Sequence, residues 1–397
     1  MDTLFCSGNN TPVTQDCVVK CSAQRSDRSV ISLSSQPDNM IKQCQAKIAR
    51  RLFFYFAAIF SVPFIHCYDS LPSRQGLLVT VAQESWKLSY KRLVSELAPQ
   101  SRSGAYTRPV AQFTGSASRI VLLSDPGRYH LYLGNPCPWC HRVALATAIL
   151  QISPSDFLTS SLEDNPIVAS KGGWTFSQTN PDKAFGVNDL KAVYDICSPG
   201  YKGKITAPLL VDKKERKIIS NESKDIVRLL GAFKASSDPL SANLYPAEIA
   251  SNVDAKNDWL YSNLNNAVYR AGFATEQSPY DEAVETVSRA LDSIDRDLSK
   301  STFINGESVT ESDLFLLPTI VRFDAVYSVL FKCTGKRISD YEHIQRWVRQ
   351  MHSMPGVFDT YDLKDAVRSY YSQMFPLNPS RIVPLTHVPS YLQRPTS

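Results

Sequence analysis

The sequence predicts an α/β domain that is followed by an all-α domain. Residues 128–235 alternate short apolar runs of strand length with amphipathic runs of helix length. Residues 244–360 carry apolar side chains at helical spacing only. The chain has 397 residues, of which 43% are hydrophobic and 20% are charged. It is therefore long enough for two globular domains and a leader.

Charge and cysteine content exclude several classes of protein. The net charge of +5 is too small, and Lys and Arg are too scattered, for a nucleic-acid-binding protein. Most of the nine cysteines lie in the first 67 residues, and only Cys137, Cys140, Cys197 and Cys333 follow. These four are too few and too far apart for a disulfide scaffold. Because no second Cys/His pair follows at zinc-finger spacing, we expect no metal.

Residues 1–83 are interpreted as a leader that contains a targeting segment. Residues 1–40 are polar and are predicted to be disordered. A basic run then precedes the apolar block at 52–65, LFFYFAAIFSVPFI, which has the length of a signal-peptide core. A signal peptide followed by a plastid transit peptide, a secretory signal and a signal anchor all fit this order. A buried core helix is disfavoured because Pro63 interrupts the block.

The α/β domain is organised around a cysteine at the start of its first helix. Residues 84–127 form an expected extension, and residues 129–133 then predict a strand. A Gly-Asn-Pro turn leads to Cys137, with Pro138 in the first helical turn. Free N–H groups and the helix dipole stabilise a thiolate at that position. Cys137 is therefore the predicted reactive thiol.

The rest of this domain, which we expect to end near residue 235, completes a β-α-β-α-β-β-α order. After the Cys137 helix we expect strands and helices at residues 156–162, 187–196, 205–212, 217–219 and 224–233. The last helix opens at Asn221-Glu222-Ser223, and Pro208 precedes the third strand. This order, with Cys before the first helix and Pro before the third strand, is typical of thioredoxin-like folds.

The all-α domain is predicted to contain several amphipathic helices. They are expected at residues 254–269, 279–298, 312–332 and 341–351. Thr310 to Asp313 supply candidate N-caps, and Asp313 is expected to cap and brace its helix rather than act on a substrate. Residues 361–397 are expected to form a C-terminal tail.

Seven separated motifs carry a resemblance to a known family. They are GRYHLYLGNPCPWCHR (127–142), GGWTF (172–176), YKGKITAPLLVD (201–212), SNES (220–223), NNAVYRAGF (265–273), LLPTIVRFDAVY (316–327) and SYYSQMFPLNPSRIVP (369–384). In this order they resemble the Xi-class glutathione transferases, also called glutathionyl-hydroquinone reductases. The plant-type, plastid-associated branch is the most similar.

The resemblance implies a thioredoxin-like glutathione-binding domain followed by an all-helical glutathione-transferase C-terminal domain. It also implies an enzyme with glutathione as co-substrate, a homodimer and a plastid location. A secretory or cytoplasmic location stays open, and no membrane contact is expected for the mature domain. The implied reaction removes glutathione from a glutathionyl-hydroquinone, which gives hydroquinone and oxidised glutathione. Cys137 would attack the sulfur of the conjugate and form a mixed disulfide with glutathione.

The resemblance also implies a set of glutathione-binding residues. Ser223 would hold the γ-glutamyl carboxylate and Glu222 its ammonium, with simple helix capping as the alternative. Ala207, before a cis Pro208, would offer its backbone to the glutathione cysteine. Trp174 would contact glutathione, with core packing as the alternative. Lys191 stands where relatives commonly have arginine and would lack the bidentate fork.

Aromatic residues of the helical domain and its tail are the candidate quinol pocket. Tyr269 could hydrogen-bond the quinol oxygen and donate toward the leaving group, and Tyr327, Tyr370 and Tyr371 could line the pocket, although aromatics at helical spacing are more often core.

Two residues next to the nucleophile leave alternatives open. Cys140 stands where most relatives have Ala, and it is interpreted either as a buried substitute for that Ala or as a resolving thiol. His141 is expected to be structural, because its position turns it away from Cys137.

Two other functions remain open at this point. One is a glutaredoxin-like deglutathionylase or dithiol reductase that uses Cys137 and Cys140. The other is a non-catalytic binding protein related to glutathione transferases. The pKa of Cys137 distinguishes the non-catalytic protein from the enzymes. A value near 8.5, that of an ordinary thiol, would count against catalysis.

Overall fold

The computed structural model describes residues 72–114, 125–165, 173–238 and 240–394. The disorder expected for residues 1–40 and the apolar block at 52–65 both lie outside these ranges. In the described residues no helix combines the length and apolarity needed to cross a membrane.

The first described helix, α2 (Pro72–Leu97), corrects one expected boundary. The division between leader and extension at residue 83 falls inside this helix. Its sequence is rich in Leu, Lys, Glu, Gln and Ser and has no Gly or Pro after Gly76, so helix formation continues across residue 83. Val94 and Ala98 at its carboxyl end are buried in the core, whereas Leu78 and Trp86 are exposed.

A five-stranded sheet forms the centre of the α/β domain. Its strands are β1 (Tyr129–Gly134), β2 (Phe157–Asp164), β3 (Trp174–Thr175), β4 (Leu209–Asp212) and β5 (Lys217–Ser220). They are arranged in the order β3-β2-β1-β4-β5. Strand β1 runs parallel to β2 and antiparallel to β4. This mixed sheet confirms the thioredoxin-like prediction, to which it adds the short edge strand β3.

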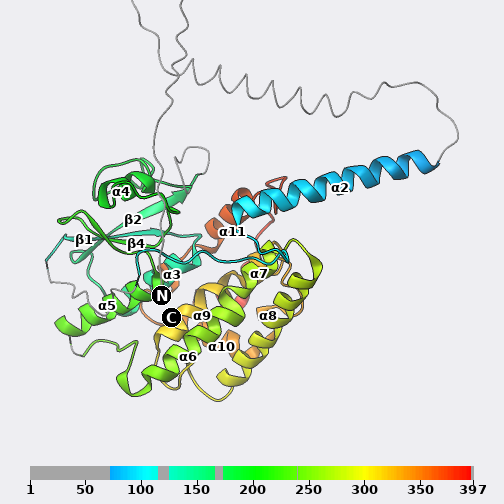
Figure 1. Ribbon diagram of the computed structural model, residues 1–397. Coiled ribbons are helices and arrows are strands. Elements are labelled where there is room, and N and C mark those ends of the chain that lie inside the picture. The colour runs from blue at the N-terminus through cyan, green and yellow to red at the C-terminus, as the bar shows by residue number, and fades with distance from the viewer. Residues whose placement is uncertain (1–71, 115–124, 166–172, 239, 395–397) are drawn as a thin grey trace, which may run out of the picture. The chain divides into compact units, whose positions relative to one another are not determined.

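Helices cover both faces of the sheet, as Figure 1 shows. Helices α3 (Pro138–Ile149) and α5 (Ser223–Ser237) pack together on one face. The short α4 (Leu190–Cys197), capped by Asp189, packs on the other face. The buried residues of β1 serve both layers, because Leu131 faces the α3 side and Tyr132 faces the α4 side.

The second domain contains α-helices, as predicted, but two of the expected helices are divided. Its helices are α6 (Ala250–Leu260), α7 (Ala267–Phe273), α8 (Gln277–Leu298), α9 (Glu311–Arg322) and α10 (Glu342–His352). Five-residue π-helical segments, Tyr261–Asn265 and Phe323–Tyr327, follow α6 and α9. Short 3₁₀ turns lie at Ala247–Ile249, Ile338–Asp340, Phe358–Thr360 and Ser390–Leu392.

The segment expected to be a tail contains a helix of the core. Helix α11 (Leu363–Gln373) begins after Asp362, whose carboxylate accepts hydrogen bonds from the backbone N–H groups of Lys364 and Asp365. It buries Ala366, Val367 and Tyr370 against the helical domain. The apolar face of this helix belongs to the same core, so the core continues past residue 360, where the helical domain was expected to end.

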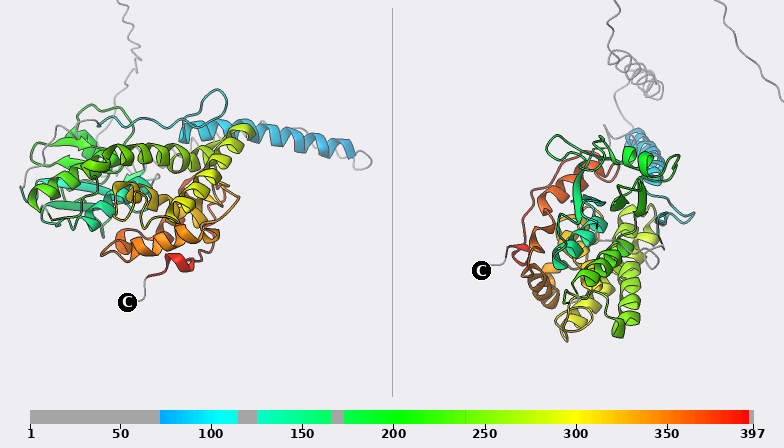
Figure 2. Two further views of the ribbon diagram at one scale, coloured as in Figure 1. Left: turned by 90° about the horizontal axis from the view of Figure 1, so that it is seen from below. Right: turned by 90° about the vertical axis from the view of Figure 1, so that its left-hand side faces the viewer.

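The two domains share one core and a buried ion pair. Helix α3 packs against α9, and Figure 2 shows the helical domain beside the sheet domain from two further sides. Arg228 of α5 donates to both carboxylate oxygens of Glu311 at 3.1 Å. Asn257 of α6 also donates to Glu311, at 2.7 Å. The Glu311 carboxylate is fully buried, so these partners compensate its charge.

Asp313 has the capping role that the sequence predicts. It completes a capping box with Thr310 and also accepts hydrogen bonds from Ile304 N and Trp347 Nε1, each at 2.9 Å. Burial raises the pKa of this carboxyl group above its ordinary value, although the hydrogen bonds act in the opposite direction.

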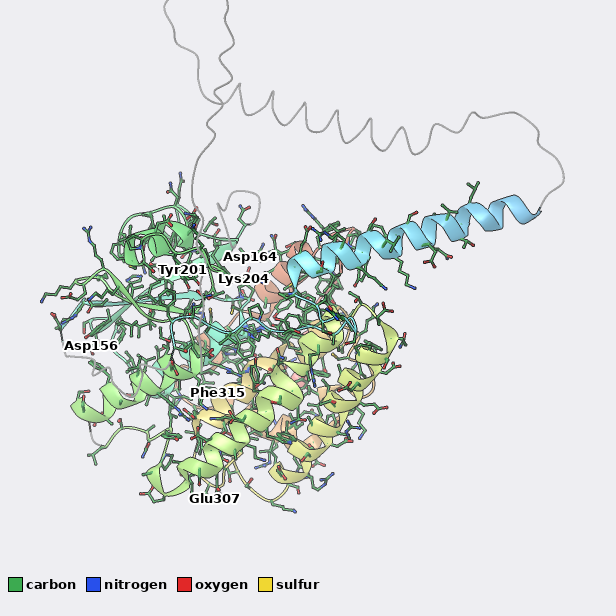
Figure 3. All side chains as sticks on the ribbon, in the orientation of Figure 1. Asp156, Asp164, Tyr201, Lys204, Glu307 and Phe315 are labelled. Atoms are coloured by element: carbon green, nitrogen blue, oxygen red, sulfur yellow. The ribbon has the colours of Figure 1, made fainter. Side chains whose placement is uncertain are left out.

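We expect Asp313→Ala to lower the free energy of unfolding by about 3 kcal/mol, because buried donors lose their acceptor. Urea unfolding measures this loss. The exposed Glu307, labelled in Figure 3, supplies the control Glu307→Ala, which should change stability little. An Asp313 variant as stable as the wild type would contradict the bracing role.

Candidate active site

Cys137 lies at the amino end of α3, where the predicted thiolate site should be. It is the N-cap residue, with Pro138 in the first turn. Its Sγ lies 3.7 Å from the carbonyl oxygen of Ala207, to which the thiol can donate. The Ala207–Pro208 peptide is cis, as the family resemblance requires. The α3 amino end and the segment before β4 therefore meet at one sulfur atom.

The surroundings of Cys137 favour its thiolate form. Its pKa is lowered to about 7, chiefly by a hydrogen bond from the Cys140 thiol. Burial opposes this shift, whereas the backbone N–H groups of Cys140 and Trp139 and the charge of Arg108 support it. A substantial fraction of Cys137 is therefore nucleophilic at neutral pH.

Cys140 is a buried thiol that donates to Cys137. Its side chain is 1% exposed, and burial is the largest cause of a pKa well above the ordinary thiol value. The adjacent Cys137 thiolate adds to the same effect. At neutral pH Cys140 is thus a protonated hydrogen-bond donor.

A cavity of about 490 Å³ opens beside this site, between the two domains. The α/β domain contributes Ala207, Pro208, Glu222 and Ser223 to its lining. The extension contributes residues 106 and 108–112, and the helical domain contributes Asn257, Asp258, Tyr261 and Phe315. Three residues of this lining are labelled in Figure 3, namely Tyr201 and Lys204 of the α/β domain and Phe315 of α9.

Positive charge gathers in the cavity. Its lining includes Arg108, Arg142, Lys204 and Lys224. The guanidinium groups of Arg108 and Arg142 lie 4.0 and 4.4 Å from the ring centre of Trp139, so both make cation–π contacts. Burial lowers the pKa of Arg142 to about 10, which leaves it charged at neutral pH. The cavity therefore suits an anionic ligand.

Glu222 and Ser223 lie at the wall of the cavity where α5 begins. The Glu222 carboxylate caps α5 by accepting a hydrogen bond from Lys224 N at 3.2 Å. The Ser223 hydroxyl donates to the same carboxylate at 3.2 Å. Asn221 instead donates to Tyr194 and Thr206. Capping and ligand binding are thus compatible here, because Glu222 caps the helix while it faces the cavity.

Three tyrosine hydroxyls from three elements meet beside the cavity. The Tyr269 and Tyr370 hydroxyl oxygens are 2.5 Å apart, and those of Tyr327 and Tyr370 are 3.3 Å apart. The ring of Trp139, which lines the cavity, lies 6.5 Å from that of Tyr269. Burial is the main cause of the raised pKa of each tyrosine, so all three remain protonated hydroxyl donors.

Three of the predicted site residues lie elsewhere. Trp174 packs its ring on Gly134, where an added Cβ would lie 2.5 Å from it, and this contact favours the packing alternative. Lys191 forms an ion pair with Asp195 on its own helix. Tyr371 donates to the carbonyl oxygen of Ala325 and does not join the other tyrosines. None of the three lines the cavity. Cys137 and Tyr269 do not line it either, but they lie against Ala207 and Trp139, which do.

His141 has the structural role that its position predicts. Its Nδ1 accepts from Arg322 at 3.0 Å, and its Nε2 contacts the Thr360 hydroxyl at 2.9 Å. Burial is the largest cause of its strongly lowered pKa, so the ring is neutral. Among the residues that the structure describes, no group of three or more His, Cys, Asp or Glu is placed to hold a metal ion.

Sequence reasoning missed several residues of the cavity. Tyr106 and Arg108 belong to the extension, which has no periodic pattern to mark it. Trp139 and Arg142 belong to the same motif as Cys137. Their closeness to Cys137 in the sequence could have marked them as site residues. Tyr261 enters the cavity from a π-helical segment that the helical pattern alone does not reveal.

Comparisons with known proteins agree with this geometry. Residues 277–350 match the family model described as glutathione S-transferase, C-terminal domain. The chain is 37% identical to glutathionyl-hydroquinone reductase PcpF of Sphingobium chlorophenolicum, over 72% of this chain and 91% of the relative. It is 36% identical to glutathionyl-hydroquinone reductase YqjG of Escherichia coli, over 66% of this chain and 80% of the relative.

Solved structures give the same picture. The Xi glutathione transferase of Phanerochaete chrysosporium superposes with a TM-score of 0.67 at 30% identity, covering 73% of this chain and 95% of that one. Glutathione-bound YqjG of E. coli superposes with a TM-score of 0.63 at 32% identity, covering 73% and 93%.

We expect the rate of Cys137 alkylation by iodoacetamide to rise with pH around a midpoint near 7, because only the thiolate reacts. In Cys140→Ala the midpoint should move toward 8.5, the ordinary thiol value, since the main stabilising donor is gone. Cys140→Ser keeps a donor and should retain most of the shift. A midpoint in Cys140→Ala equal to that of the wild type would show that Cys140 does not tune the nucleophile.

Proposed function

This chain belongs to the Xi class of glutathione transferases, the glutathionyl-hydroquinone reductase family, and we propose that it removes glutathione from glutathionyl-hydroquinones. The observation that carries the proposal is the Cys137 thiolate in contact with Ala207, which lines a cavity rich in Arg and Lys. Trp139 of the same wall packs near Tyr269, one of three protonated tyrosines. Glutathione is the co-substrate, in keeping with the glutathione-bound relatives of known structure.

The proposed reaction has two steps, and in each a thiolate attacks a sulfur atom. The Cys137 thiolate attacks the sulfur of the conjugate, a Cys137–glutathione disulfide forms, and the bond between sulfur and the quinol ring breaks. The electron pair of that bond goes to the ring, which takes up a proton to complete the hydroquinone. A second glutathione thiolate then attacks the glutathione sulfur of the mixed disulfide. This step releases oxidised glutathione and restores the Cys137 thiolate.

The cavity supplies the groups that would hold glutathione. Ser223 and the amino end of α5 face the γ-glutamyl carboxylate, and Glu222 balances the ammonium group beside it. Ala207 offers its backbone next to Cys137. Arg108 and Lys204 supply positive charge for the remaining carboxylate.

The tyrosine cluster, which we define as Tyr269, Tyr327 and Tyr370, is the proposed quinol pocket. Each hydroxyl can donate one hydrogen bond, and the cluster is largely removed from water. A donor aimed at the quinol oxygen stabilises the charge that develops as the ring accepts the electron pair. The cluster therefore assists the first step and not the second.

Single-cysteine chemistry is favoured over a dithiol reductase. Cys140 is buried and protonated, so it assists Cys137 without exchanging disulfides itself. Mass spectrometry of protein oxidised with glutathione disulfide distinguishes the two. A stable glutathione adduct on Cys137 supports the proposal, and an internal Cys137–Cys140 disulfide favours the dithiol alternative. The lowered pKa of Cys137 argues against a non-catalytic binding protein.

Assembly and location extend the proposal. A homodimer is proposed from the family, and sedimentation of the purified protein tests it.

A plastid location is proposed from the order of basic and apolar residues in the leader. A fluorescent protein fused to residues 1–83 tests this, and a secretory or cytosolic signal would contradict it.

Turnover of glutathionyl-menadiol is the direct test of the proposed function. We expect Cys137→Ser to lose at least about 10³-fold in kcat, because the serine hydroxyl is not ionised at neutral pH. Cys140→Ser should keep most of the activity. A wild-type protein that binds glutathione but releases no quinol from the conjugate would overturn the proposed function.

Tyr269→Phe should lower kcat on the order of 10²-fold by removing a donor to the quinol oxygen. The matched control is Tyr371→Phe, since Tyr371 is also buried but donates to a backbone carbonyl. Its kcat should stay within about twofold of the wild type. If both variants lost the same activity, the effect would belong to core packing and not to a substrate contact.

A further inference from the structure

The loop before the nucleophile is held by a buried arginine of the other domain. Arg322, the last residue of α9, donates from Nη2 to the Asn135 carbonyl oxygen at 2.8 Å. Its Nε donates to the Pro136 carbonyl oxygen at 3.3 Å. These two peptide groups directly precede Cys137, so Arg322 holds the backbone that carries the nucleophile.

The remaining contacts of Arg322 fix its own position. Nη1 donates to His141 Nδ1 and to the Pro318 carbonyl oxygen, each at 3.0 Å. His141 lies in the first turns of α3, so the guanidinium spans both sides of Cys137 in the sequence. Arg322 is fully buried, and within the described residues it forms no ion pair with a carboxylate. Its charge is compensated by neutral acceptors arranged around one planar fork.

The Asn135 side chain gives the same loop a second connection to the helical domain. Its Nδ2 donates to Asp365 Oδ2 at 2.7 Å and to the Asp362 carbonyl oxygen at 3.0 Å. Its Oδ1 accepts from Asp362 N at 2.7 Å. Asp362 is the N-cap of α11, so this loop is fixed to the start of that helix.

The two elements that hold the loop also carry two members of the tyrosine cluster. Tyr327 ends the π-helical segment that begins directly after Arg322, and Tyr370 lies on α11. We infer that Arg322 and Asn135 are positioning residues that set the distance and orientation of the Cys137 sulfur relative to the tyrosine cluster. The attack on the conjugate needs both partners at once, and a displacement of about 1 Å can reduce a rate on the order of 10²-fold.

This inference rests on the proposed function and predicts a particular kinetic pattern. The proposed glutathione contacts lie on the α/β domain and the extension, whereas the tyrosines lie on the helical domain. Loss of the connection should therefore spare glutathione binding and affect the step that needs both domains. Lysine retains the charge of Arg322 but cannot reach both carbonyls with a planar fork. Arg322→Lys is thus the informative variant.

We expect Arg322→Lys to lower kcat on the order of 10²-fold, with KM for glutathione within about twofold of the wild type. Asn135→Ala should lower kcat about tenfold with the same unchanged KM. In both variants, hydrogen exchange of the backbone amides in residues 134–141 should be faster than in the wild type. Asn135 is only partly buried, so its variant decides the matter if Arg322→Lys does not fold.

The matched control is Arg228→Lys, the same substitution at another arginine of the domain junction, which contacts Glu311 and not the Cys137 loop. It should leave both kcat and the exchange of residues 134–141 unchanged. Equal losses in Arg228→Lys and Arg322→Lys would overturn the inference, because any loosening of the junction would then suffice. A loss confined to KM, or unchanged exchange and kcat in both Arg322→Lys and Asn135→Ala, would also overturn it. If the wild type does not turn over the conjugate, the proposed function fails, and hydrogen exchange alone decides the positioning role.

Discussion

The packing of α3 between the sheet and α9 is the constraint on which the rest of this structure depends. Cys137 is the N-cap of α3, so the helix that joins the two domains begins at the nucleophile. The sheet side supplies the Ala207 backbone and the start of α5, while the helical side supplies tyrosine hydroxyls. The proposed attack of the Cys137 thiolate on the sulfur of a glutathionyl-hydroquinone needs both, and neither domain has both alone.

Burial favours the protonated form of both the thiol and the tyrosines, but the net protonation state differs between them. This difference suits the proposed chemistry. For Cys137, hydrogen bonds from Cys140 and from the helix amino end outweigh the cost of burying a negative charge. For Tyr269, burial and the neighbouring tyrosines all raise the pKa. For Tyr370, burial outweighs the lowering effects of Arg322 and of the hydrogen bond with Tyr269, so both hydroxyls stay protonated. One site therefore contains a nucleophile that has lost its proton and donors that keep theirs, within the same pH range.

The sequence predicts most of the fold because local signals and long-range packing agree there. The strand and helix around Cys137 and the cap at Asp313 lie where residue patterns place them, whereas the cis peptide at Pro208 was implied only by the family resemblance. The prediction fails where tertiary contacts decide. Tyr370 enters the core on a helix that was expected to be a tail.

The candidate site shows the same limit. Cys137, Glu222 and Ser223 lie in motifs at helix starts and could be predicted from them. Arg108 comes from a segment without a periodic pattern, so only the folded chain brings it to the cavity. Trp174 and Lys191 were expected from the family resemblance, yet the ring of one packs on Gly134 and the other pairs with Asp195.

If the proposed leader is removed, the extension that lines the cavity limits where the chain can be cut. Tyr106 and Arg108 form part of the cavity wall, and the Gln100–Tyr106 bridge holds the segment between them and α2. Val94 and Ala98 are buried in the shared core just before it. A protease that removed the chain beyond these residues would delete part of the binding site. Maturation that preserves activity must therefore cut on the amino-terminal side of Val94, and the α2 residues exposed ahead of it are the part that can be lost.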